Sequence, residues 1–224
     1  MTPIPRLDIL GSALADSSRA RMLCELMDGR AFTNKELAAA AGVTPQTASS
    51  HLRQLADAGL TLAERSGRCT YHRIARAEVA EALETLSALA PCDHLYRGQQ
   101  QKGARLQMLE ARSCYAHLAG RLATDIASAL NTRGLITRND GQFRLHTDRV
   151  WDKLGVSLPA NATARACLDW TERKPHIGGS VGQQLLNHAL SSGWLKRQKQ
   201  ARGMTITQAG RRAYLELLGV QCPG

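Results

Sequence analysis

Apolar residues recur three and four positions apart through the first 90 residues, and turn-forming residues divide them into short helices. The first helix runs through Asp28, with Asp16 or Ser17 as its N-cap and Gly29 after its end. Its apolar positions fall on one face. This pattern predicts a buried scaffold helix.

Two further helices follow, separated by a short turn. Thr33 precedes a glutamate by three residues, the spacing of a capping box, and the helix 34–41 ends at Gly42. Thr44 then caps a second helix with Pro45 at its first position, where a missing N–H costs nothing. Helix, glycine turn and helix in this order predict a helix-turn-helix unit.

The segment LTLAERSGRCTYHRIA alternates as two strands around Ser66 and Gly67, which predicts a β-hairpin, or wing, directly after that unit. Residues 76–90 then carry an apolar stripe at helical spacing, and Pro91 ends the helix. Such a stripe needs a partner surface. We therefore expect a winged helix-turn-helix module over 13–76 and a dimerisation helix after it.

The polar residues 97–102 (RGQQQK) predict a joint between two domains, 1–96 and 97–224. The fold class expected for the whole chain is mainly α with small β-hairpin wings, and the C-terminal domain is expected to be helical and winged-helix-like. Its expected elements are a long helix over 104–130 broken mildly at Gly120, a hairpin around 138–141, helices over 162–173 and 181–193, a basic hairpin within 194–210, and a closing helix over 210–218.

The second helix of the helix-turn-helix has the composition of a DNA-reading helix, because short polar side chains near a helix N-terminus reach base edges in the major groove. The residues expected to contact DNA there are Thr44, Gln46, Thr47, Ser49, Ser50, His51, Arg53 and Gln54. An ordinary amphipathic surface helix is the alternative. The wing favours DNA, since Arg65, Arg68 and Arg73 surround a hairpin in the position that contacts phosphate or the minor groove.

Residues 10–92 resemble the ArsR/SmtB family of dimeric repressors. The segments that carry the resemblance are DSSRARMLCELMDG, NKELAAAAGVTPQTASSHLRQLADAGL and LAERSGRCTYHRI. It implies a homodimer formed through the first helix and 76–90, and double-stranded operator DNA as partner. More faintly, RSCYAHLAG and CLDWTERKPHIGG resemble the accessory domain of longer members, in which an effector would be sensed.

Two metal sites of that family have no counterpart here, because the helix NKELAAAAGV lacks cysteine and the dimerisation helix ARAEVAEALETLSALA lacks histidine. Other pairs could bind a transition or soft metal ion, or sense oxidation. In the alternative, each is a buried scaffold residue. The pairs are Cys92 with His94, Cys114 with His117 one helical turn apart, and Cys167 with His176.

A small-molecule effector is the other option for the accessory domain. Aromatic rings supply apolar area and arginines clamp anions, so these residues could line a pocket for an anionic or aromatic molecule, with a packed core as the alternative. Its expected lining consists of Tyr115, Trp151, Trp170, Arg112, Arg173 and His176.

The net charge of +10 suggests a polyanionic partner, yet it is unevenly divided. Residues 1–95 carry 10 Lys and Arg against 11 Asp and Glu, whereas the remainder carries 19 against 8. The basic C-terminal half is therefore expected to contribute accessory contacts to the DNA backbone, or else to present a solvated basic face. The residues expected to make those contacts are Lys196, Arg197, Lys199 and Arg202.

Several function classes are disfavoured. No run of about 20 apolar residues and no signal peptide is present, and the scattered cysteines fit a reducing compartment, so a cytoplasmic protein without a membrane partner is expected. No glycine-rich nucleotide fingerprint, HExxH or GxSxG occurs, so we expect no enzyme and no catalytic residues. The competing classes are a methyltransferase-like enzyme with a winged-helix dimerisation module and a DNA-independent interaction module.

Overall fold

The computed structural model describes residues 4–90, 107–198 and 202–222. The chain divides into two compact units, Met1–Glu84 and Thr85–Gly224, and each is described by itself. The expected joint at 97–102 and the expected boundary after residue 96 lie outside the described residues.

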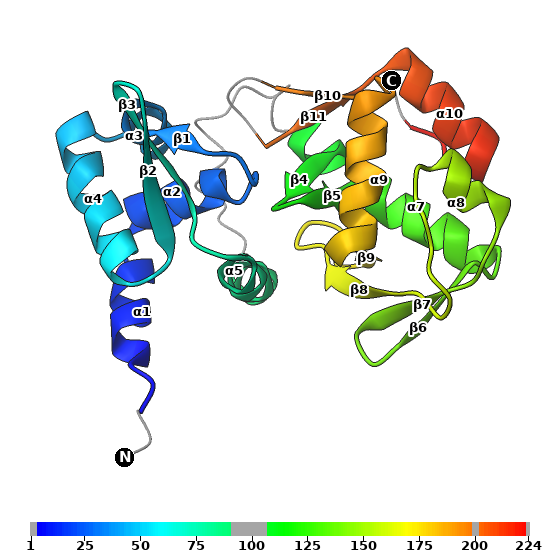
Figure 1. The fold of residues 1–224 in the computed structure, drawn as a ribbon, viewed down its shortest axis with the longest axis horizontal. Helices are drawn as coiled ribbons and strands as arrows, with labels where there is room; N and C mark the ends of the chain where they lie inside the picture. The colour runs from blue at the N-terminus through cyan, green and yellow to red at the C-terminus, as the bar shows by residue number, and fades with distance from the viewer. Residues whose placement is uncertain (1–3, 91–106, 199–201, 223–224) are drawn as a thin grey trace. The chain divides into compact units, whose positions relative to one another are not determined.

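The first unit packs short helices against a small sheet (Figure 1). Its elements are α1 (Leu7–Leu14), α2 (Ser17–Leu26), β1 (Phe32–Thr33), α3 (Asn34–Ala41), α4 (Pro45–Asp57), β2 (Thr61–Ser66) and β3 (Cys69–Ile74), and α5 (Ala77–Leu89) begins in it. Helix α1 was not predicted; no side chain caps its N-terminus, and most of its apolar residues are exposed.

The predicted helix starts are confirmed atom by atom. The Asp16 carboxylate accepts hydrogen bonds from two backbone N–H groups of α2. Thr33 and Glu36 form the capping box of α3, which ends at Gly42 in the left-handed conformation. Thr44 accepts a hydrogen bond from the backbone of α4. These local bonds fix the helix-turn-helix geometry.

The wing is also confirmed. Strands β2 and β3 pair antiparallel from Thr61–Ile74 to Ser66–Cys69, leaving a two-residue turn that contains Gly67 at φ +58°. Strand β1 adds to β3 and gives the order β1-β3-β2. The hairpin therefore extends from the sheet of the helix-turn-helix unit.

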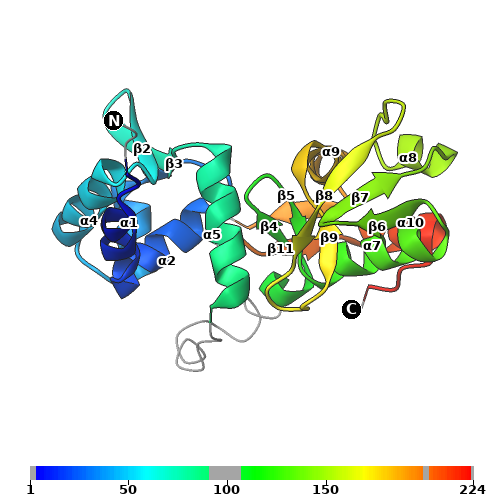
Figure 2. The ribbon, with the colours of Figure 1, turned by 90° about the horizontal axis from the view of Figure 1, so that it is seen from below.

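Within its described residues, the second unit contains three separate sheets, with helices beside them (Figure 2). One sheet has four strands in the order β6-β7-β8-β9, and β4-β5 and β10-β11 form two-stranded sheets. The elements are β4 (Arg112–Cys114), β5 (His117–Ala119), α7 (Arg121–Thr132), β6 (Ile136–Asn139), β7 (Gln142–Leu145), α8 (Arg149–Lys153), β8 (Thr163–Leu168), β9 (Pro175–Ile177), α9 (Gly179–Ser191), β10 (Leu195–Arg197), β11 (Met204–Ile206) and α10 (Gln208–Leu218).

Two predicted helices of this unit are wrong. The helix expected over 104–130 is interrupted by the hairpin β4–β5, and α7 begins only after Gly120. Gly120 has φ +88°, and a Cβ there would lie 2.9 Å from two backbone carbonyl oxygens, so the backbone turns where only glycine fits. The segment 162–173 forms strand β8, because pairing with β7 and β9 outweighs its local helix propensity.

The hairpins expected around 138–141 and within 194–210 are confirmed, as are the helices that follow the pattern of 181–193 and 210–218. The elements of the second unit form a repeat. The order hairpin, helix, hairpin, helix occurs twice, as β4-β5-α7-β6-β7-α8 and as β8-β9-α9-β10-β11-α10.

Corresponding positions of the two repeats lie 59 residues apart. His117 and His176 are related in this way, as are the positive-φ glycines Gly120 and Gly179 at the following helix starts. Buried apolar residues match with the same offset: Leu118 with Ile177, Leu122 with Val181, Leu130 with Ala189, and Ile136 with Leu195. The repeats also interlock, because α7 packs against β9 while α9 packs against β5.

Candidate functional sites

One face of α4 is polar and exposed. Gln46, Ser50 and Arg53 lie four and three positions apart and therefore share this face. Thr44 and Thr47, whose hydroxyl oxygens are 2.9 Å apart, form the N-terminal cap beside it. The opposite side of α4 is buried in the first unit through Ala48, Leu52 and Leu55.

Three other residues expected to read DNA are engaged within the unit. Arg19 donates a hydrogen bond of 2.6 Å to the Gln54 side chain, and the same nitrogen lies 3.3 Å from Nδ1 of His51. Ser49 accepts a hydrogen bond of 2.7 Å from Asn34. Their polar atoms thus orient α4 against α2 and α3.

The wing places its arginines at three positions. Arg65 lies in β2, Arg68 in the turn and Arg73 in β3, and all three are exposed. Arg73 also points one guanidinium nitrogen toward the carbonyl of Ile74, at 3.5 Å. Arg65 and Arg68 therefore make the outermost cationic groups of this hairpin.

A second site lies in the C-terminal unit, where the cysteines and histidines stand opposite each other on paired strands. Cys114 is the register partner of His117 across β4–β5, and Cys167 is the partner of His176 across β8–β9. The expectation that Cys114 and His117 lie one helical turn apart is wrong. They are neighbours because a two-residue turn joins their strands.

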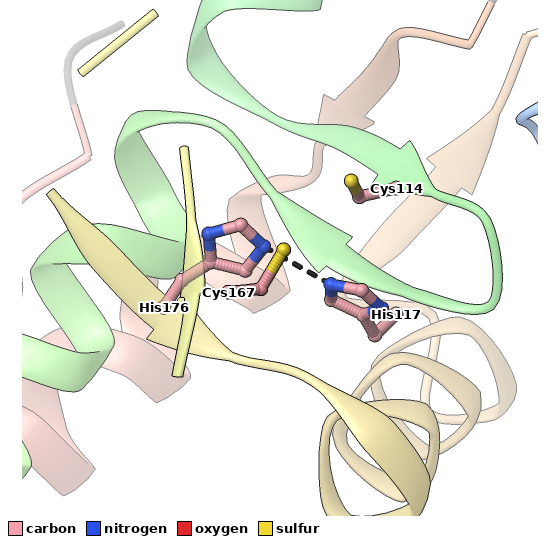
Figure 3. A group of neighbouring side chains, drawn as sticks. All are labelled: Cys114, His117, Cys167 and His176. Atoms are coloured by element: carbon pink, nitrogen blue, oxygen red, sulfur yellow. Dashed lines mark hydrogen bonds between the residues drawn. The ribbon is translucent and has the colours of Figure 1, made fainter. Parts of the chain in front are cut away.

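The structure joins these two pairs in one cluster, here called the Cys2His2 cluster (Figure 3). The four side chains approach one another from the two hairpins, and one donor atom from each, a sulfur or a ring nitrogen, lies within 4.8 Å of the other three. The Nε2 atoms of His117 and His176 are 3.1 Å apart. All four residues are buried.

Electrostatics favour a thiolate in this cluster. Hydrogen bonding with Cys114 lowers the pKa of the Cys167 thiol far below its ordinary value; burial acts in the opposite direction, and hydrogen bonds with His117 and His176 lower the pKa further. Burial lowers the pKa of His117, which favours its neutral form. Thiolate sulfur and neutral imidazole nitrogen are the forms that bind metal ions.

An ion pair lies directly behind the cluster. Both side chains of Arg112 and Asp169 are fully buried, and the guanidinium donates two hydrogen bonds of 2.8 Å to the carboxylate. Nδ1 of His176 is buried without a hydrogen-bond partner and lies 3.8 Å from the Asp169 carboxylate. The sequence did not single out Asp169; the link between residues 112 and 169 arises only from tertiary structure.

Two residues expected to line an effector pocket, Arg112 and Trp151, are buried in the core. Arg112 is held in the buried ion pair, with its guanidinium 4.7 Å above the ring of Trp170. Trp151 is a core residue whose indole N–H donates to the carbonyl of His146. The packed-core alternative therefore describes these side chains.

The structure describes three of the four basic residues expected to contact the DNA backbone. Arg202 donates two hydrogen bonds to the carbonyl of Ser113 and so holds β4. Lys196 and Arg197 lie exposed in β10. Residues expected to serve here that fall outside the described part of the chain are Cys92, His94 and Lys199.

Comparisons with known proteins agree with the first site. A model described as a helix-turn-helix domain matches residues 14–64. The chain is 36% identical to the uncharacterized HTH-type transcriptional regulator YdfF of Bacillus subtilis, over 97% of this chain and 99% of that protein. It is 40% identical to the HTH-type transcriptional regulator CmtR of Mycobacterium tuberculosis, over 34% of this chain and 64% of that one.

Solved structures are similar over the N-terminal part. One is the homodimeric winged helix-turn-helix domain of a possible ArsR-family regulator from Mycobacterium bovis, at 30% identity and TM-score 0.35, covering 45% of this chain and 99% of that one. Another is the cadmium sensor CmtR of M. tuberculosis, at 35% identity and TM-score 0.33, covering 42% and 94%. Such TM-scores add nothing to the sequence match. No helix in the described ranges is long and apolar enough to cross a bilayer. Because a relative at 36% identity matches this chain from end to end, and the winged helix-turn-helix is confirmed, the chain belongs to the HTH-type transcriptional regulators.

Proposed function

We propose that the protein acts as a homodimeric repressor that inserts two copies of α4 into successive major grooves of a pseudo-palindromic operator. The observation that carries the proposal is that some polar side chains of α4 are exposed while others are bonded within the unit. Gln46, Ser50 and Arg53 form one exposed face, whereas His51 and Gln54 are occupied by Arg19. Fewer residues of α4 are therefore available to contact bases than its composition suggests.

Apolar surface on two helices supports the homodimer. Leu86 and Leu89 of α5 are 50% and 78% exposed, and Leu7 of α1 is 70% exposed. Leu86 and Leu89 lie three positions apart on one side of α5 and mark a surface that a partner covers. A second copy is the fitting partner, because a two-fold operator requires two reading helices.

The C-terminal unit serves regulation in this proposal. A signal sensed there changes operator affinity when it binds the free and the DNA-bound states unequally, and a coupling of about 1–3 kcal/mol changes affinity several-fold to hundredfold. The protein performs no catalysis in this role. It acts in the cytoplasm, where the DNA is found and where a reducing environment keeps cysteines from forming disulfides.

The test is footprinting on the DNA upstream of the protein's own gene, followed by binding titrations with variants. Replacing Gln46 or Arg53 by alanine removes about 1–3 kcal/mol of base contact, which raises Kd about 5- to 150-fold. Arg138→Ala is the matched control, because Arg138 is an exposed arginine of the second unit. Absence of a protected site, or equal effects of Arg53→Ala and Arg138→Ala, would overturn the proposal.

The wing is tested by salt dependence. Arg65→Ala combined with Arg68→Ala removes two phosphate contacts, so the slope of log Kd against log salt should fall by about 2. An unchanged slope would remove the wing from the interface.

A further inference from the structure

We propose that Cys114, His117, Cys167 and His176 bind one zinc-class metal ion in a closed, four-coordinate site that joins the two repeats of the C-terminal unit. The site lies in a different unit from α4, and its existence does not depend on DNA binding.

The donor atoms have the right identity and spacing. Two thiolates and two imidazoles are a typical ligand set for tetrahedral Zn²⁺. With Zn–N bonds of about 2.0–2.1 Å, two nitrogens of a tetrahedron lie about 3.3 Å apart. The Nε2 atoms of His117 and His176 are 3.1 Å apart, and all four donor atoms lie within 4.8 Å of one another. This space suits one ion and is too small for a two-iron cluster, whose ligand pairs stand further apart.

A buried orphan nitrogen points to the same ligand. Nδ1 of His176 has no hydrogen-bond partner although its residue is 0% exposed, a costly arrangement in a core. When Nε2 binds a metal ion, Nδ1 carries the proton and faces the Asp169 carboxylate at 3.8 Å. A carboxylate behind a ligating histidine is the common way to fix ring orientation and tautomer.

Asp169 is itself held rigidly for that task. Its oxygens accept hydrogen bonds from Arg112, from the backbone N–H of Gly120, and from the hydroxyl and backbone N–H of Thr171. Gly120 and Arg112 flank the hairpin that supplies Cys114 and His117. The carboxylate therefore links the supports of both ligand pairs.

The repeat explains why the donors converge. Each repeat contributes one cysteine and one histidine from its first hairpin, β4–β5 or β8–β9. The two histidines occupy equivalent positions, 59 residues apart. Because α7 packs against β9 and α9 against β5, these hairpins meet between the interlocked helices. One ion at this point ties the two repeats together.

Burial separates this site from the alternatives. Cys114 is 5% exposed and Cys167 8% exposed, whereas redox-sensing thiols need solvent access. Four protein ligands leave no coordination position for substrate, which is typical of structural rather than catalytic zinc. A Zn²⁺ ion held by two thiolates and two neutral imidazoles forms a site with no net charge.

The experiment measures metal content and coordination in the full-length chain. Protein purified from zinc-supplemented cells should hold about one zinc per chain. Replacement of zinc by Co²⁺ should give thiolate-to-cobalt charge-transfer absorption and the intense d–d bands of a tetrahedral site. Thiol labelling should spare Cys114 and Cys167 until a chelator is added, while the exposed Cys69 reacts throughout.

Variants assign the ligands. Cys114→Ser and Cys167→Ser should each weaken zinc binding at least tenfold, whereas Cys222→Ser, at a partly buried cysteine of the same unit, should retain it. Should the ligand variants fail to fold, the cobalt spectrum and labelling of the unaltered chain still decide. A folded chain without zinc and without a tetrahedral cobalt spectrum, or one with Cys114 and Cys167 joined in a disulfide, would overturn the proposal. Operator binding is not a readout here, so either proposal can fail alone.

Discussion

Asp169→Asn should be among the most destabilising conservative substitutions in the C-terminal unit. The change keeps the shape of the side chain but removes the charge that balances Arg112, and both side chains are fully buried. The side chain of asparagine also puts an NH2 group where a carboxylate oxygen now accepts hydrogen bonds from neighbouring donors. We therefore expect a buried, unpaired guanidinium in the variant.

The magnitude follows from that pair. Removing one partner of a buried ion pair costs about 3–5 kcal/mol, a large part of the roughly 5–15 kcal/mol that stabilises a domain. At a urea m value of about 2 kcal/mol per molar, the midpoint should fall by about 2 M. Asp140→Asn is the control: it makes the same chemical change in an exposed turn, where asparagine tolerates the φ of 42°.

Tryptophan fluorescence is a suitable assay because all three tryptophans, Trp151, Trp170 and Trp194, belong to the second unit. Urea titrations with saturating zinc keep any loss of metal affinity from adding to the result. A decrease of less than about 1 kcal/mol in the free energy of unfolding, or a decrease equal to that of Asp140→Asn, would refute the assignment of Arg112 and Asp169 as a structural ion pair.

Three further predictions concern packing, assembly and pH. Gly182→Ala should cost about 1–3 kcal/mol by urea titration, because its Cβ would lie 2.2 Å from the carbonyl oxygen of Ile177; Ser180→Ala, on the exposed side of α9, should stay within about 0.5 kcal/mol. Leu89→Glu should shift the dimer towards monomer in analytical ultracentrifugation, and a dimer of unchanged stability would contradict the role of α5. Burial lowers the pKa of His72, so the unfolded chain binds more protons below about pH 6.5, and stability should decline as the pH falls through that value. Hydrogen exchange of the β3 amides measures this pH dependence of stability, and His72→Gln should abolish the dependence.

The parts of the fold that local chemistry controls were predictable from the sequence. Capping at Thr33 and Thr44 and the glycine turn at Gly42 act within a few residues, and each is confirmed. The wing followed from strand alternation around Gly67. Helix α1 was missed because it begins without a capping side chain.

Long-range pairing accounts for the parts that were not predictable. Cys114 and His117 were recognised as a pair, but their strands could not be told from a helix without knowing that Gly120 turns the backbone. The histidines of the two pairs are 59 residues apart in the sequence. A signal for this relation does exist in the sequence: His117-Leu-Ala-Gly and His176-Ile-Gly-Gly repeat at that interval, each followed by an amphipathic helix.

The central claim is that Arg53 and its neighbours on α4 read bases, and a double-mutant cycle between protein and operator tests it most directly. Each operator position is changed in turn, and binding is measured with the unaltered protein and with Arg53→Ala. The account predicts one base pair per half-site whose change costs the unaltered protein about 1–3 kcal/mol and costs the variant almost nothing. Equal losses for both proteins at every position would contradict base reading by Arg53.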